Sequence, residues 1–147
     1  AETRIRALNR TGGILFAQER FAEAAARFEE ALQLTEDLRA SHPDLPDTSK
    51  NLVDVLTNLG MHRLALGEYE EALELLHLAL EEQLSIDQPA GVRAAFQALL
   101  QQEADRHAAL HAALDCLGEM LWRSQRDGAP PDAKEYLECL GRRSLST

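Results

Sequence analysis

Two histidines four residues apart, His107 and His111, come closest to a metal-binding pattern in this sequence. Side chains at i and i+4 lie on one face of a helix, and Glu103 and Asp115 extend the row at the same spacing. Imidazoles and carboxylates together could bind a divalent ion. The zinc protease motif needs a glutamate directly after the first histidine, and Ala108 stands there instead. Alternating charge on a solvated helix face also produces such a row, and we predict no metal and no cofactor.

Other residue arrangements typical of catalysis are missing from the sequence. No glycine-rich loop follows a strand, no CxxC motif occurs, and no nucleophile stands in a recognisable turn. Adjacent carboxylates occur at Glu29-Glu30, Glu70-Glu71 and Glu81-Glu82. Neighbours on a helix point in different directions, so these pairs are typical of surface charge. The sequence predicts that the chain is not an enzyme.

The two cysteines, Cys116 and Cys139, both stand in helical contexts. A secreted disulfide framework usually has more cysteines, at loop positions. We therefore predict reduced thiols and a cytoplasmic location. The sequence leaves open that the two side chains face each other.

The charge balance limits the kind of partner. With 15 Lys and Arg against 25 Asp and Glu, the formal net charge is −10. Such a chain repels nucleic acid and anionic membranes and suits a basic partner. A simpler interpretation is that the acidic residues keep a helical surface soluble. No apolar run approaches the roughly 20 residues that span a bilayer.

Length and composition favour one all-helical domain. The chain has 147 residues, and 45% are hydrophobic, mostly Leu and Ala rather than Val or Ile. Residue 1 is Ala rather than Met, so one interpretation is that the chain is a fragment of a larger protein.

Apolar residues recur every three or four positions and predict a series of amphipathic helices. Pro43, Gly67 and the turn at 127–131 mark helix ends. The predicted helices cover residues 3–18, 21–40, 47–67, 69–85, 90–126 and 132–142.

The helix predicted over 90–126 is unusually long. Only Gly91 and Gly118 interrupt its helix-forming residues, although 101–109 is largely polar. Either one helix exposes its middle to solvent, or two helices meet near 104–108. We favour one long helix because no glycine or proline breaks this stretch.

Small and large apolar residues repeat in register along the chain. The clearest copy runs Leu56-x-x-Leu59-Gly60, then Gly67-Glu68-Tyr69-x-x-Ala72-x-x-x-Leu76-x-x-Ala79. The same order occurs upstream, where Gly12 matches Gly60, and a weaker copy lies downstream, where Gly118 matches Gly60. The upstream copy comprises Leu8, Gly12, Leu15, Phe21, Ala24, Phe28 and Ala31. The downstream copy comprises Leu114, Leu117, Gly118, Leu121, Ala133, Leu137 and Leu140.

This pattern resembles the tetratricopeptide repeat, a helix–turn–helix unit of about 34 residues. The spacing between the copies is longer than that and is similar to the long-helix repeats of kinesin light chains. The resemblance implies an all-α, right-handed α-solenoid of about three hairpins that includes the long helix. Its units would cover about 3–40, 47–86 and 90–142 within one domain, 1–147.

The resemblance also implies a non-catalytic scaffold that binds a peptide or helix of a partner protein. In this family the first helix of each unit lines a concave groove. The matching contact positions are Arg6, Asn9, Phe16, Asp54, Asn58, Met61, Asp115, Glu119, Trp122 and Arg123.

The contact positions include two kinds of recognition chemistry. Asn9 and Asn58 could bond an extended backbone, because a carboxamide both donates and accepts. Arg6 and Arg123 could bind a carboxylate. Each could equally be an ordinary solvated side chain. The basic clamp of the chaperone-binding members is not reproduced, because the second unit lacks the basic residues.

Two further interpretations remain open. The exposed ends of a repeat stack could pair between copies, which would make the chain a homo-oligomerisation module, for example a homodimer. The chain could also be the sensor or regulatory arm of a larger signalling protein.

Overall fold

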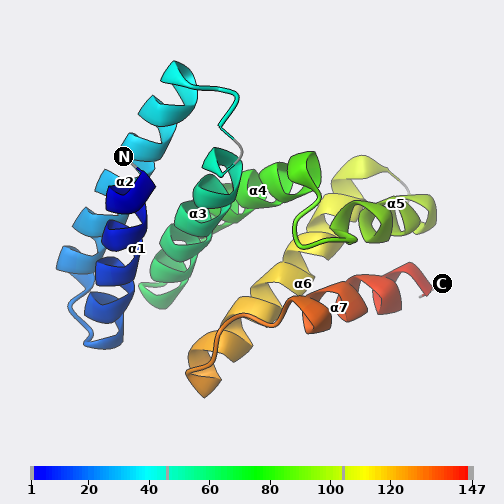
Figure 1. Cartoon of the computed structure of the whole chain (residues 1–147). Helices are drawn as coiled ribbons and strands as arrows, with labels where there is room; N and C mark the ends of the chain where they lie inside the picture. The colour runs from blue at the N-terminus through cyan, green and yellow to red at the C-terminus, as the bar shows by residue number, and fades with distance from the viewer. Residues whose placement is uncertain (1, 46, 104, 146–147) are drawn as a thin grey trace. The chain divides into compact units, whose positions relative to one another are not determined.

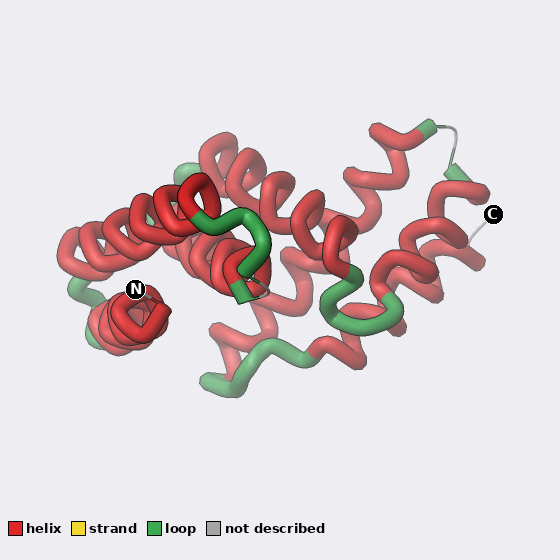
Figure 2. The backbone as a smooth tube through the Cα atoms, turned by 45° about the horizontal axis from the view of Figure 1, so that its top comes forward, coloured by secondary structure: helices red, strands yellow, loops and turns green. Residues whose placement is uncertain are grey.

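Helices joined by short turns make up the computed structural model, which describes residues 2–45, 47–103 and 105–145 (Figures 1 and 2). No strand occurs in these three ranges, and the predicted all-α class is confirmed. Within them, no helix is long and apolar enough to cross a membrane. The helices are α1 (Glu2–Ala17), α2 (Phe21–Ser41), α3 (Thr48–Ala65), α4 (Tyr69–Ile86), α5 (Val92–Gln102), α6 (Arg106–Asp127) and α7 (Ala133–Leu145).

The chain divides into two compact units, and the boundary falls inside α4, between Glu82 and Gln83. The first unit holds α1 to α3 and most of α4. The second holds the end of α4 and α5 to α7. The single domain over 1–147 stays a prediction.

In the first unit, α1 and α2 form an antiparallel hairpin, and α3 packs against both (Figure 1). Apolar residues at helical spacing meet in the middle and bury one face of each helix. The α4 helix joins this core at Ala79, which packs against α3. The residues at the centre are Ile5, Leu15, Ala24, Phe28, Ala31, Val55 and Leu59.

The two hairpin turns of the first unit have the same backbone geometry at matching positions of the repeat. Glu19 and Gly67 both adopt positive φ, at 60° and 79°. The next amide in each turn donates to the carbonyl five residues earlier: Arg20 to Leu15 and Glu68 to Arg63, both at 2.9 Å. A left-handed residue followed by this bond ends a helix and satisfies one of its free carbonyls. The repeat therefore extends from side-chain spacing to turn conformation.

At two of the three glycines that match in the repeat, the two helices of a hairpin come into close contact. A Cβ at Gly12 would lie 2.5 Å from the Phe28 ring, and a Cβ at Gly60 would lie 2.7 Å from Leu76 Cδ2. Phe28 and Leu76 are separated along the chain by the same offset as Gly12 and Gly60. At both positions only glycine lets the second helix of the hairpin approach the first this closely.

The third matching glycine makes no such contact, because a Cβ at Gly118 would meet nothing within 4 Å. The positive-φ residue of the next turn, Gly128, follows Gly118 by ten positions, whereas Gly67 follows Gly60 by seven. The longer helix end places Gly118 out of register with a close helix contact.

The second unit is a three-helix arrangement in which α7 packs against both α5 and α6. Its buried centre includes Val92, Leu99 and Leu140. The phenol of Tyr136 on α7 donates to Gln83 Oε1 at the end of α4, at 2.9 Å. Because α7 packs against α5 as well as α6, the unit differs from the single hairpin expected for 90–142.

The prediction of one long helix over 90–126 is also wrong. The α5 helix ends at Gln102, and Glu103 and Asp105 have extended backbones. Ala104 lies outside the described residues. The Asp105 side chain accepts a hydrogen bond from the Ala108 amide at 2.8 Å, which caps the start of α6. A capping aspartate can start a new helix where neither glycine nor proline ends the previous one.

Candidate protein interface

A carboxamide pair joins the first helices of the two hairpins in the first unit. Asn58 Nδ2 on α3 donates to Asn9 Oδ1 on α1, at 3.1 Å, and both side chains are half-buried. Each amide can make further hydrogen bonds, because a carboxamide has two donor hydrogens and an acceptor oxygen. The structure thus brings together two residues that the sequence had assigned to one surface.

Three further predicted contacts lie on the same two helices. Arg6 is exposed, and Asp54 and Met61 lie on α3 beside Asn58 in the helical register. Partial desolvation raises the pKa of the Asp54 carboxyl above its usual value, and the positive charge of Lys50 opposes that shift. Together with the asparagine pair, these side chains give the α1–α3 face polar, charged and flexible apolar groups.

Phe16 is placed differently from the expectation that it contacts a partner. Its ring packs edge-to-face on Phe21, with centroids 5.3 Å apart, and lies 6.0 Å from the His62 ring. The ring is half-buried beside the first hairpin turn. Its evident role is to pack the turn, with only part of the ring left for a partner.

His62 is a partnered residue that the sequence analysis did not identify. It is 1% exposed, and its Nε2 lies 2.8 Å from the Phe21 carbonyl oxygen. Its Nδ1 is buried without a hydrogen-bond partner among the described residues. Helical spacing places it on the buried side of α3, shortly after Gly60, and that position was the available signal.

Arg63 is a second residue that the sequence analysis missed. Its guanidinium lies within 4 Å of Glu29, Glu68 and Glu71, at 3.1, 3.4 and 3.7 Å. A hydrogen bond shared with Glu68, together with repulsion from its charge, raises the pKa of Glu71. Arg63 thereby links α2 and the start of α4 to the end of α3.

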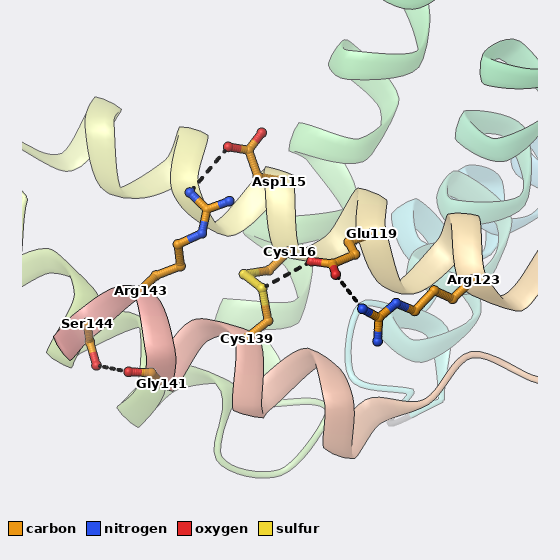
Figure 3. Close-up of a disulfide and its surroundings, with 8 residues drawn as sticks. All are labelled: Asp115, Cys116, Glu119, Arg123, Cys139, Gly141, Arg143 and Ser144. Carbon is orange, nitrogen blue, oxygen red and sulfur yellow. Dashed lines mark hydrogen bonds and ion pairs between the residues drawn. A yellow bond between two sulfur atoms is a disulfide. The ribbon is translucent and has the colours of Figure 1, made fainter. Parts of the chain in front are cut away.

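In the second unit, the four predicted contact residues lie on α6, and three of them are paired within the unit (Figure 3). Arg123 lies 2.7 Å from Glu119 and 3.3 Å from Glu135, and Asp115 lies 3.6 Å from Arg143. A partner carboxylate would have to compete with both glutamates for Arg123. Trp122 is 56% exposed, with the Arg126 guanidinium 4.8 Å from its ring centroid.

The prediction of reduced cysteines is wrong. Cys116 on α6 and Cys139 on α7 form a disulfide, with Cα atoms 5.7 Å apart (Figure 3). The two helices pack side by side and bring the two buried sulfur atoms together, so the disulfide forms between helices and not between loops. Disulfides persist mainly in oxidising compartments, and the cytoplasmic location stays a prediction.

The His107–His111 pair lies at the start of α6, with ring centroids 4.4 Å apart and both side chains exposed. The break before Asp105 removes Glu103 from their helix, and Asp115 faces Arg143. The described part of the chain contains no group of three or more residues placed to hold a metal ion.

The comparison with family models gives two matches. The tetratricopeptide repeat model matches residues 3–76, half of the 147-residue chain. The chain belongs to the tetratricopeptide repeat family. A second model, described as "Domain of unknown function (DUF1841)", matches residues 66–142. No curated protein and no solved structure matches the chain significantly.

The tetratricopeptide match covers the first hairpin and its second copy up to Leu76 on α4. These repeats generally mediate protein–protein interaction and are typically not catalytic. The α1–α3 face belongs to this part of the chain, whereas Asp115, Glu119, Trp122 and Arg123 belong to the part that the second model matches.

Proposed function

We propose that the chain is a non-catalytic scaffold whose first unit binds an extended segment of a partner protein on the α1–α3 face. The observation that supports this most is the Asn9–Asn58 pair, which joins the first helices of two successive repeats. Side chains on these helices face the groove in tetratricopeptide repeats. The long offset between Gly12 and Gly60 supports our proposal of long-helix repeats of the kinesin light chain kind. A right-handed twist of the stack is part of the same proposal.

The chemistry of the face suits a polypeptide backbone. The Asn9 amide retains its donor hydrogens, and the Asn58 oxygen retains its acceptor capacity, so together they can bond a peptide N–H and carbonyl. Arg6 and Asp54 can select charged side chains, and the flexible thioether of Met61 can adapt to an apolar one. The chain's charge of −10 favours a partner with basic residues.

The test compares partner capture by the wild-type chain and by the double variant Asn9→Ala/Asn58→Ala. Proteins captured from a lysate are identified by mass spectrometry, and the affinity of each specific partner is then measured. We expect at least a tenfold loss of affinity, since two hydrogen-bonding side chains are removed. Far-ultraviolet circular dichroism should stay unchanged.

The matched control is Gln33→Ala, which removes an exposed carboxamide from α2. Capture by this variant should equal that of the wild type. Equal capture by the double variant would exclude the α1–α3 face as the binding site. Light scattering over a concentration series addresses homo-oligomerisation, since a strictly monomeric chain eliminates that alternative.

A further inference from the structure

A concave site lies within the first unit, away from the α1–α3 face. It is a cavity of about 670 Å³ among the end of α2, the start of α3 and the last turns of α4 before Gln83. Ligand sites typically occupy about 300–1,000 Å³. Successive residues of an α-helix are rotated by about 100° around its axis. By this geometry Leu52 and Leu56, which line the cavity, lie on the side of α3 opposite Asp54, Asn58 and Met61. The cavity is therefore independent of the proposed peptide-binding face.

The wall of the cavity is apolar in its centre. Leu52 and Leu56 are 9% and 4% exposed, and Leu78 on α4 presents an exposed side chain to the same space. Such a wall favours a ligand with an aliphatic portion, because apolar surface leaves water when it enters.

One carboxylate oxygen in the lining lacks a hydrogen-bond donor. Glu82 is 9% exposed, and its Oε2 lies 3.1 Å from the Arg39 guanidinium. Its other oxygen, Oε1, is buried without a hydrogen bond from the described residues. Buried polar atoms are nearly always hydrogen-bonded, and leaving one unsatisfied is costly, most of all on a charged group. This oxygen calls for a donor that comes from outside the chain.

The charge of the residues that line the cavity indicates the sign of the charge on that donor. Among the described residues that line the cavity, Glu36, Glu81 and Glu82 are acidic and Arg39 is basic. The excess of carboxylates favours a cation. Only one oxygen of Glu82 lacks a hydrogen bond, which suits a compact ammonium rather than the two-pronged guanidinium of arginine.

We propose that this cavity binds a lysine side chain from a basic segment of a partner protein. The aliphatic stem lies along Leu52, Leu56 and Leu78, and the ammonium donates to Glu82 Oε1. This site adds a lysine-specific contact that does not depend on the α1–α3 face.

The test uses the whole chain with ¹³C-labelled leucine methyl groups. The probe is the acetylated and amidated tripeptide Ala-Lys-Ala, and its reference is the same peptide with norleucine, which keeps the stem and loses the charge. We expect saturable shifts at the methyls of Leu52, Leu56 and Leu78 with the lysine peptide, and about tenfold weaker binding of the norleucine peptide.

Three variants link the binding to Glu82. Glu82→Gln should weaken the lysine peptide about tenfold, because the charged acceptor is lost. Glu74→Gln makes the same charge change at an exposed position of α4 and should leave binding unchanged. Arg39→Gln should strengthen binding, since it frees the second oxygen of Glu82; this variant also tests the proposal if Glu82→Gln fails to fold.

Several outcomes would overturn the proposal. They are equal binding of the two peptides, no shift at the three leucines, and equal weakening by Glu82→Gln and Glu74→Gln. Tighter binding of spermidine at the same methyls would assign the cavity to a free polyamine instead of a protein segment. Asn9→Ala/Asn58→Ala should leave peptide binding here intact, so failure of this site and failure of the α1–α3 face are distinguishable.

Discussion

Adjacent glycines in α1 have opposite environments. A Cβ at Gly12 would clash with the buried ring of Phe28, whereas a Cβ at Gly13 would meet nothing within 4 Å. Both residues lower the intrinsic helix propensity of α1 to the same extent. The difference between them therefore isolates the cost of separating α1 from α2.

We predict that Gly12→Ala lowers the free energy of unfolding by about 1–2 kcal/mol. Overpacking costs about 1–3 kcal/mol, and this cost outweighs the gain in helix propensity. Gly13→Ala should raise it by about 0.5–1 kcal/mol. Gly60→Ala should lower the free energy of unfolding as Gly12→Ala does, and Gly118→Ala should raise it as Gly13→Ala does. Urea unfolding of all four variants provides the measurement. Stabilisation by Gly12→Ala would show that Phe28 moves aside freely.

A second residue-scale prediction concerns Tyr136, whose phenol is buried against Gln83. Burial raises the pKa of Tyr136 above its usual 10.0, because the phenolate loses its hydration. The folded state thus holds this proton more tightly than the unfolded state does. The contribution of this proton to the free energy of unfolding is fully present below pH 10 and is lost as the pH rises above 10.

Tyr136→Phe should lower the free energy of unfolding by about 1–3 kcal/mol at pH 8, because it leaves the buried Gln83 oxygen without its donor. Its stability should also fall less steeply between pH 10 and 11 than that of the wild type. Denaturant titrations at both pH values measure this. Tyr69→Phe, at a 65% exposed position, is the control and should change neither quantity. Parallel pH curves for Tyr136→Phe and wild type would contradict the argument.

Residue identity predicted some of these contacts and not others. Gly12 and Gly60 were predictable because the absence of a Cβ is itself the requirement. The bond between Asn9 and Asn58 was not, because it depends on how far α1 slides along α3. Gly118 has the same identity as Gly60, but it stands farther from the turn that follows it.

At the scale of helices, a residue at the N-cap position can contribute a side-chain hydrogen bond to the start of its helix or none. The α3 and α6 helices both follow an aspartate, yet only Asp105 accepts a hydrogen bond from its helix, whereas Asp47 makes no side-chain cap bond. The identity of the capping residue alone therefore does not determine its contribution.

Asp105→Ala should lower the free energy of unfolding by about 1 kcal/mol, because the Ala108 amide loses its acceptor. Asp47→Ala is the matched control and should cost much less. Thermal unfolding of the two variants side by side compares them. Equal losses would indicate that net charge, rather than the cap bond, sets the effect.

Helix ends were predictable where Pro43 or Gly67 follows two residues later, since these residues restrict or permit particular backbone angles. The break between α5 and α6 was missed because helix-forming residues flank it on both sides. Its signals were the polar stretch at 101–109 and a capping aspartate within it. Neither excludes a continuous helix by itself, and packing of α7 against α5 and α6 accompanies the break.

At the scale of the whole molecule, two family models meet on one continuous helix. The tetratricopeptide match ends at residue 76, and the second match begins at 66, so both include the start of α4. The contact boundary at Glu82 also falls in α4. The sequence predicted the repeat character of the first unit, because its two copies share one offset. It did not predict the second unit, where the disulfide has no counterpart among the described residues of the first.

The disulfide should therefore stabilise the second unit alone. Its cysteines have a sequence separation of 23, so Cys116→Ser/Cys139→Ser should cost about 3 kcal/mol of loop entropy. Hydrogen exchange followed by mass spectrometry should show faster exchange in α6 and α7 and unchanged exchange in α1 and α2. Reductant added to the double variant is the control and should change nothing. Faster exchange in α1 and α2 by the same factor would mean that both units open together. The shared helix α4 would then transmit the full loss of unfolding free energy across residue 82.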